Sequence, residues 1–355
     1  MSSAVSAKQA AKETAQKKNE RKLTVSIVIP TKDRPDELKV TMETVLKQTA
    51  LDRILELVIV DQSTTDETKR YLEELQKRVP FRIKYVYSNI PSVTRSKNIG
   101  LKNSEGDIVL FLDDDVTLAP DFVEKILEVY EKHPEAIGVG GYLVSTRYGR
   151  LYRIYARLFL LPHDDKNRAR VLPSTFVTYP VGLKDVIRAE WIPGGCSSFR
   201  RAIFKEMLFD ENFGRRSSKG DVDFAYRLHL KYPGSMFITP HAKMIHRASK
   251  KQRLKPYQTI YVREVQTLYF IYKNMLPYEK SAVKRIVYML AYLWSAIGRV
   301  IDPFRVMFFL KSKDKRYAME AAYTMYAIIY ALKNKDKIAR GDLSFLNREI
   351  LGIAG

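Results

Sequence analysis

Apolar runs alternate with amphipathic segments along the first 130 residues. Runs with the length and composition of buried strands lie at residues 25–30, 57–60, 82–87 and 108–112. Each is followed by a segment with helical spacing, at residues 37–48, 67–78, 94–103 and 121–132. Strands that alternate with helices usually pair in parallel, so the pattern predicts an α/β fold built on a mostly parallel sheet.

Polar residues stand at the ends of three predicted strands. Thr31, Asp61 and Asp113 each follow an apolar run. Ligands of open α/β sheets bind beyond the carboxyl ends of the strands. We therefore expect the three side chains to converge on one crevice.

The strand at residues 108–112 ends in three consecutive carboxylates, Asp113, Asp114 and Asp115. Like charges at a strand end repel one another unless a cation holds them. Mg²⁺ and Mn²⁺ take oxygen ligands and are often shared with phosphate oxygens. The run predicts a site for a metal-bound phosphorylated substrate, and a solvated acidic turn is the alternative.

The second half of the chain is less regular. The stretch from Gly138 to about Val186 predicts no clear elements, whereas 191–196 predicts a tight turn whose paired glycines let backbone approach a ligand. A helix at 224–230 and a strand at 236–240 follow, and from about Tyr257 the pattern is mainly helical.

The cysteine content and the distribution of charge indicate the expected compartment and the expected binding partners. The only cysteine is Cys196, so no intramolecular disulfide forms and a reducing, cytoplasmic location is expected. Residues 1–23 predict a flexible basic tail without the apolar core of a signal peptide. Residues 243–340 hold 21 Lys and Arg against six Asp and Glu, out of a net charge of +21. This basic third predicts a polyanionic partner, either an anionic lipid surface or a nucleic acid.

Six segments resemble one known family in order and spacing. They are VSIVIPTKDRPDEL, LVIVDQSTTDET, SVTRSKNIGLKNSEGDIVLFLDDDV, WIPGGCSSFRRAIF, FDENF and KGDVDFAYRL. The chain resembles the family 2 glycosyltransferases, inverting enzymes of the GT-A fold with nucleotide-sugar donors. The resemblance covers residues 24–250 and leaves 251–355 as a basic helical extension.

The resemblance implies a donor site. By position in the family's pattern, Thr31, Asp61 and Asp113 take the nucleoside of a UDP-, dTDP- or GDP-sugar. A carboxylate at Asp61 accepts an imide N–H of uracil or thymine as well as N1–H of guanine, so it does not select the base. Arg95 and Lys97 are expected to neutralise the diphosphate, with solvated charges at a helix start as the alternative.

The resemblance also implies a divalent cation, Mn²⁺ or Mg²⁺. The family's two-Asp metal motif is matched by Asp113 and Asp115, of which Asp115 is the expected ligand. A late histidine often supplies another ligand in this family. His246 holds the similar place here, and His241 is its rival.

The expected general base is Asp221. The family uses the Asp of a Glu-Asp pair, and here Gly220 stands where the Glu is expected. Asp223 is expected to orient the helix or the acceptor, because an Asp in a first helical turn is also good capping chemistry. The acceptor region is expected to include Gly194 and Gly195.

Trp191 completes the expected acceptor region. Its ring would offer an apolar face to a sugar or lipid, and a tryptophan buried in the core is the alternative.

Single-sugar transfer is expected rather than polymerisation. The Gln-x-x-Arg-Trp signature of processive relatives lacks its Arg and Trp in residues 252–256. Two other functions stay open: nucleotide-sugar binding without catalysis, given Gly220, and nucleic-acid binding. The basic charge carries no nucleic-acid motif and lies outside the segment with the metal cluster, so no nucleic-acid partner is expected.

The apolar runs of the extension are too short to cross a bilayer. Residues 286–298 and 321–332 fall below the roughly 20 residues that a spanning helix needs. Lys and Arg flank both runs, which suits helices that lie on an anionic membrane, with a break at Pro303-Phe304. We expect a peripheral protein on the inner face of the cell membrane and a lipid-linked or cell-surface glycan acceptor. Helices packed on the catalytic domain are the alternative.

Overall fold

The computed structural model describes residues 22–144, 148–214, 219–249, 251, 253–309, 311 and 314–352. Apart from Lys22 and Leu23, the predicted basic tail lies outside the described residues. Gln252, the first residue of the segment compared with the Gln-x-x-Arg-Trp signature, also lies outside them.

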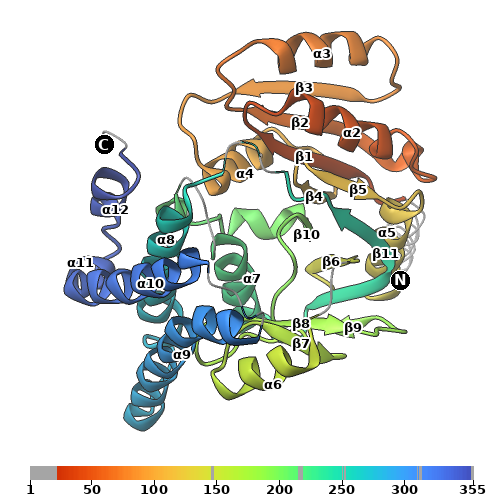
Figure 1. Cartoon of the computed structure of the whole chain (residues 1–355). Helices are drawn as coiled ribbons and strands as arrows, with labels where there is room; N and C mark the ends of the chain where they lie inside the picture. Colours follow the sequence, from red (N-terminus) through yellow and green to blue (C-terminus); the bar gives the residue numbers. More distant parts are fainter. Residues whose placement is uncertain are drawn as a thin grey trace, which may run out of the picture.

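One large curled sheet organises the described part of the chain (Figure 1). Its strands follow the order β3-β2-β1-β4-β10-β6-β11-β5, with β9 paired to β11. Strands β3, β2, β1 and β4 run parallel, and β10 joins β4 in the antiparallel sense. The strand bounds are β1 Val25–Thr31, β2 Ile54–Asp61, β3 Arg82–Tyr87, β4 Ile108–Leu112, β5 Val116–Leu118, β6 Gly138–Leu143, β9 Ile187–Arg188, β10 Cys196–Arg200 and β11 Met236–His246.

Helices cover both faces of the sheet, because the central strands are apolar on both sides. In β1, Ile27 and Ile29 point to one face while Val28 points to the other, and all three are fully buried. The first face packs against α2, α3 and α5, and the second against α4, α7 and α8. The helices are α2 Pro35–Val45, α3 Glu67–Gln76, α4 Val93–Lys102, α5 Phe122–Lys132, α7 Gly220–Lys231 and α8 Pro256–Phe270.

The stretch without predicted elements forms a small layer at the edge of the fold. It contains helix α6, Arg150–Leu158, and the paired strands β7, His163–Lys166, and β8, Thr178–Val181. Figure 1 shows this layer below the large sheet, near α9.

Helices α9 to α12 share an apolar core with the large sheet. Tyr292 of α9 and Phe345 of α12 belong to the same apolar cluster as Val28 of β1. The bounds are α9 Ala282–Phe309, α10 Lys315–Lys333, α11 Lys335–Ala339 and α12 Ser344–Glu349. The division of the chain at residue 250 therefore stays a prediction.

Helix α9 runs through Pro303, so the break expected at Pro303-Phe304 is wrong. A proline inside a helix removes one backbone hydrogen bond and costs about 3 kcal/mol. Pro303 is buried inside α9, which continues for six residues beyond it to Phe309. None of the helices in the described residues is both long and apolar enough to cross a membrane.

Candidate functional site

Asp113, Asp115 and His246 meet at the carboxyl end of β4. Asp113 directly follows β4, Asp115 directly precedes β5, and His246 ends β11 opposite Val116 of β5. His246 Nε2 lies 2.9 Å from Oδ1 of Asp115 and 4.0 Å from Oδ2 of Asp113. One ligand atom from each residue lies within 4.8 Å of the other two. The structure therefore groups Asp115 with His246, whereas His241 is exposed on β11 outside this group.

The three side chains differ in their pKa. Burial raises the pKa of Asp113, and repulsion from Asp221 and Asp115 adds to the rise. Burial also acts to raise the pKa of Asp115, but hydrogen bonds from His246 and the backbone N–H of Ser249 outweigh it and lower that pKa. The bond to Asp115 raises the pKa of His246. Arg34 Nη1 also lies 3.6 Å from Oδ2 of Asp115, whereas Asp113 has no ion-pair partner other than His246 among the described residues.

Asp114 has a different role from its neighbours. It accepts hydrogen bonds from Thr31 Oγ1 at 2.8 Å and from Arg34 Nη1 at 3.0 Å. Burial raises its pKa to about 6. Thr31, which the sequence assigned to the nucleoside, therefore also ties β1 to the acidic run. Arg34 was missed from the sequence, although its place at the N-cap of α2 next to β1 is a usable signal.

Two glycines lie between Asp113 and Asp221. A Cβ at Gly195 would collide with the carboxylate of Asp113, and one at Gly194 would collide with that of Asp221. Only glycine fits where backbone passes this close to both side chains. The WIPGG turn therefore brings Asp113 and Asp221 to the two sides of one backbone segment.

Lys97 reaches the same segment from α4. Its Nζ forms an ion pair with Oδ1 of Asp221 and donates to the carbonyl of Gly194 at 3.1 Å. The lysine is 1% exposed, and the rings of Phe111 and Phe209 lie within 5.5 Å of Nζ. Lys97 is therefore buried and paired, and it is not a solvated charge at the start of a helix. Sequence reasoning missed its contact with Asp221 because the two residues lie 124 positions apart.

Asp61 lies at the end of β2, beside Thr31 in the register of β1. Its Oδ1 accepts from the backbone N–H of Ser63 at 2.9 Å, and Tyr85 donates its hydroxyl to Oδ2 at 3.1 Å. Burial together with the Asp61 charge raises the pKa of Tyr85 to about 12. Together with the hydrogen bond from Thr31 to Asp114, this places the three predicted strand ends side by side.

The remaining predicted residues divide between surface and interior. Arg95 is half exposed and pairs with Glu211 at 3.4 Å. Trp191 is 4% exposed, and its Nε1 donates to the carbonyl of Thr178 at 3.1 Å, so its ring lies in the core as the alternative stated. Asp223 is fully buried and accepts from Arg227, Lys273 and Asn274. The acceptor roles of Trp191 and Asp223 stay predictions.

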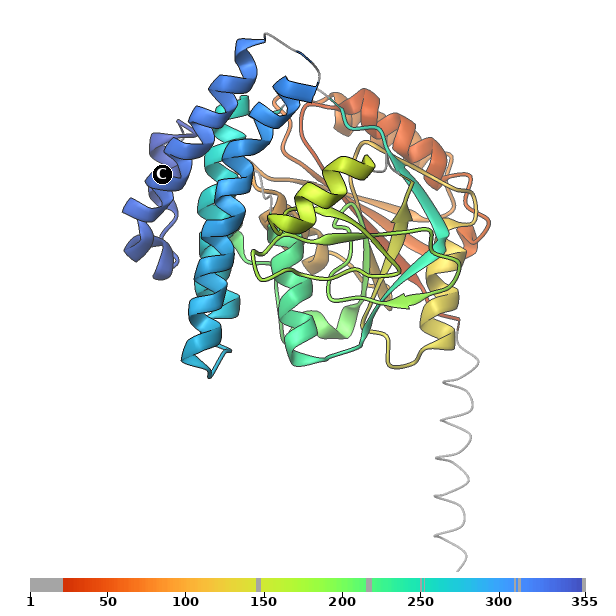
Figure 2. The ribbon, with the colours of Figure 1, turned by 60° about the horizontal axis from the view of Figure 1, so that its bottom comes forward.

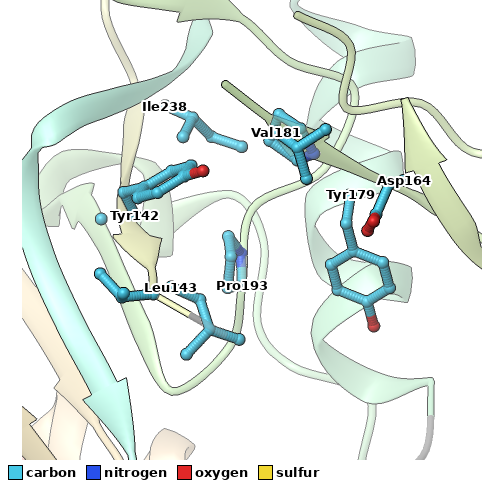
Figure 3. Close-up of a pocket in the computed structure, with 10 residues that line it drawn as sticks. Tyr142, Leu143, Asp164, Tyr179, Val181, Pro193 and Ile238 are labelled. Atoms are coloured by element: carbon cyan, nitrogen blue, oxygen red, sulfur yellow. The ribbon is translucent and has the colours of Figure 1, made fainter. Parts of the chain in front are cut away.

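A cavity of about 140 Å³ opens next to the glycine pair (Figure 3). Its lining includes Tyr142, Asp164, Tyr179 and Pro193, and the rings of the two tyrosines lie on either side of Pro193 in this view. Pro193 directly precedes Gly194, so the cavity is one residue from the backbone that Asp221 touches. Aromatic rings beside a buried carboxylate form a wall that suits a polyhydroxylated ligand.

The group Asp113, Asp115 and His246 fits a divalent cation. Carboxylate oxygens suit Mg²⁺ and Mn²⁺, and one possible ligand atom from each of the three side chains lies within 4.8 Å of the other two. On the other side of the glycine pair, Asp221 offers a carboxylate that is about one third exposed. The arrangement is able to hold a metal-bound diphosphate and to accept a proton beside it.

Comparison with known sequences agrees with this geometry. A glucosyl-dolichyl phosphate glucuronosyltransferase from Haloferax volcanii is 28% identical over 200 residues, which is 55% of this chain and 58% of that protein. The O-antigen biosynthesis protein RfbC of Myxococcus xanthus is 26% identical over 234 residues, which is 64% of this chain and 18% of that protein. The chain thus spans less than two thirds of either relative.

Solved structures show the same fold. The mannosyltransferase PcManGT from Pyrobaculum calidifontis, in complex with GDP-Man and Mn²⁺, superposes with a TM-score of 0.55 at 15% identity and covers 89% of both chains. GalNAc-T7 with UDP, GalNAc and Mn²⁺ gives 0.54 at 17% identity over 78% of this chain and 56% of that one. The family model described as glycosyl transferase family 2 matches residues 26–254. With its GT-A-like sheet and this family match over most of its length, the chain belongs to glycosyl transferase family 2.

Proposed function

We propose that this glycosyltransferase is inverting and metal-dependent, and that it moves one sugar from a nucleotide-diphosphate sugar to a hydroxyl group. One observation carries the proposal: the glycine pair holds the Asp113, Asp115 and His246 group on one side and Asp221 on the other. The proposed cation ligands and the proposed proton acceptor would then lie on the two sides of one backbone segment. A base that takes the acceptor proton and a cation that stabilises the departing diphosphate both favour direct displacement at an anomeric carbon.

For the donor, we propose that Asp61 and Thr31 contact the nucleoside, with Asp113 close to the ribose. Asp115 and His246 would hold a Mn²⁺ or Mg²⁺ ion, which neutralises diphosphate charge when bound. Arg95 lies at the start of α4 and is exposed enough to reach a phosphate. Two solved neighbours contain UDP and GDP-Man, so the base stays open among UDP, dTDP and GDP.

Asp221 is the proposed general base. Lys97 binds Oδ1, and Oδ2 has no hydrogen-bond partner among the described residues. Oδ2 would accept the proton of the acceptor hydroxyl as its oxygen bonds to the anomeric carbon and the bond from that carbon to the diphosphate breaks. Attack from the side opposite the leaving group inverts the anomeric configuration. The buried lysine fixes the carboxylate, so Lys97 is proposed to position the base rather than bind diphosphate.

The acceptor is proposed to enter the cavity beside Pro193. We propose a lipid-linked or cell-surface glycan, because one relative is named for a dolichyl phosphate substrate and another for O-antigen synthesis. The basic C-terminal third and the single cysteine support a place on the cytoplasmic face of the cell membrane.

A donor panel tests the proposal. Thermal unfolding is measured with UDP-, dTDP- and GDP-sugars, each with and without Mn²⁺. A ligand at 100 times its dissociation constant adds about 2.7 kcal/mol to the free energy of unfolding, so one base should give a clear Mn²⁺-dependent shift. Product analysis by NMR should then show an anomeric configuration opposite to that of the donor.

Asp115→Ala should remove the Mn²⁺-dependent part of that shift and leave nucleoside binding at Asp61. Asp52→Ala, on the surface turn before β2, is the matched control and should keep the full shift. Mn²⁺ that still tightens donor binding in Asp115→Ala would rule out the proposed ligand set. Retained anomeric configuration would rule out Asp221 as the base of an inverting reaction.

A further inference from the structure

Two helices carry apolar stripes that the fold leaves uncovered. In α6, Leu151, Ile154 and Leu158 are each at least 60% exposed. In α9, the apolar residues at 286, 290, 294, 297, 301, 304 and 308 are between 40% and 78% exposed. Their spacing of three or four residues puts them on one side of a helix that is about 42 Å long. Exposed stripes of this length mark an interaction surface.

The two stripes form one surface, which we call the α6–α9 face. Trp294 of α9 donates its Nε1–H to the carbonyl of Leu158 at 2.6 Å and stacks on Phe159 at 5.1 Å. A Cβ at Gly298 would collide with Phe159, so glycine allows the two helices to approach this closely. Figure 2 shows α6 beside α9 on one side of the molecule.

The rim of the α6–α9 face is basic. Helix α6 holds three arginines and no acidic residue. Among the residues that the structure describes, Arg150, Arg153 and Arg285 have no acidic partner. Two copies of this chain packed through the same face would bring these arginines together, which opposes a symmetric dimer. An apolar stripe with a cationic rim instead matches the acyl chains and head groups of an anionic bilayer.

We propose that α6 and α9 together bind the surface of an anionic lipid bilayer. Helix α6 lies between segments of the catalytic domain, so the domain itself would touch the membrane and not only the C-terminal extension. This step deepens the proposed membrane location, but it does not depend on which donor or acceptor the enzyme uses.

The α6–α9 face is also connected to the cavity beside Pro193. Tyr152 of α6 stacks on Tyr148 at 4.8 Å, and Tyr148 lies 6.5 Å from Tyr179 of the cavity wall. If the proposed acceptor pocket is correct, the polar head of a membrane-borne acceptor reaches the cavity while its apolar part stays in the lipid.

Flotation of the full-length chain with liposomes tests the proposal. The vesicles are phosphatidylcholine alone, or phosphatidylcholine and phosphatidylglycerol at about 3:1, and the protein should float mainly with the second. Ile154→Glu in α6 and Phe308→Glu in α9 should each weaken binding at least about tenfold, because each removes an inserted apolar side chain. Val40→Glu in α2, also an exposed apolar position at 41%, is the matched control and should float like the wild type.

Donor binding separates this proposal from the proposed function. Both α6–α9 variants should keep the Mn²⁺-dependent thermal shift of the wild type. If Ile154→Glu floats normally while Phe308→Glu does not, α6 is not part of the lipid-binding face. If no form floats, or if the wild type is a dimer that Ile154→Glu dissociates, the bilayer is the wrong partner. Either outcome leaves glycosyl transfer untouched.

Discussion

Two of the clusters of charged side chains in the described residues differ in how their charges are paired. In the junction of α7, α8 and α9, Arg299 holds Glu264 with two bonds of 3.0 and 2.6 Å. Asp223 of α7 accepts from Arg227 of the same helix and from Lys273 and Asn274, in the short segment between α8 and α9. At the end of β4, in contrast, Asp113 and Asp115 lie 4.0 and 2.9 Å from Nε2 of His246.

The difference separates a structural cluster from a binding cluster. A buried carboxylate costs free energy unless fixed partners satisfy it. In the junction, side chains of the protein itself pair with the buried carboxylates, so these carboxylates need no ligand to offset their charge. The strand-end cluster holds three consecutive carboxylates beside Arg34 and His246, and a bound cation would add to the positive charge that offsets them. The same contrast holds within α7, where Asp221 faces the site and Asp223, two residues later, faces the junction.

The largest expected effect is on catalysis. Asp221→Asn keeps the shape of the side chain and removes its basicity, so transfer should fall by about 10² to 10⁴ fold with nearly unchanged donor affinity. Asp223→Asn should instead lower stability, because Lys273 and Arg227 lose their shared partner. Turnover, donor binding and urea unfolding are measured on both variants. If Asp221→Asn keeps normal turnover, another carboxylate is the general base.

The next effect tests the junction. Glu264→Gln leaves the Arg299 guanidinium buried without a carboxylate, which should lower the free energy of unfolding by about 3–5 kcal/mol. The double variant Glu264→Met with Arg299→Met removes both charges and should regain most of that loss. Urea denaturation measures both, with Asp115→Ala as a comparison at the open cluster. An equal loss in Asp115→Ala would contradict the division into structural and binding clusters.

Much of the parallel half of the fold follows from sequence. Strands β3 and β4 have their predicted bounds, because an apolar run between turn residues leaves little freedom. Helix α2 starts two residues earlier than predicted, since Pro35 fits the first helical turn. The strand-end positions of Thr31, Asp61 and Asp113 are confirmed, because parallel strands end at the same edge of a sheet.

Contacts between distant segments could not be predicted in the same way. The position of α6, the contact of Lys97 with Asp221 and the buried ring of Trp191 depend on packing across the sheet. No local pattern distinguishes a buried lysine from an exposed one at the start of a helix. Likewise, the break expected at Pro303 follows a local rule that tertiary packing overrides.

The smallest expected effect concerns Lys219, at the edge of the junction. Its ammonium is buried, donates to the carbonyl of Thr175 at 2.6 Å and lies 4.4 Å from the centre of the Phe176 ring. Burial, with repulsion from Arg299, lowers its pKa to about 7, whereas an unfolded lysine has a pKa of about 10.4. Between these values the unfolded chain binds a proton that the folded chain lacks, so this residue makes stability rise from about pH 7 to about pH 10.

Lys219→Met keeps the length of the side chain and removes the buried charge. The variant should be more stable than the wild type at pH 7, by an amount on the order of 2 kcal/mol, and the difference should shrink as the pH approaches 10. Urea unfolding at about pH 7 and about pH 9.5 measures this, and Lys102→Met at an exposed position of α4 should change neither value. A pH dependence that is identical in Lys219→Met and the wild type would mean that the junction already compensates this lysine. The difference between the two clusters would then lie in the cation-binding group alone.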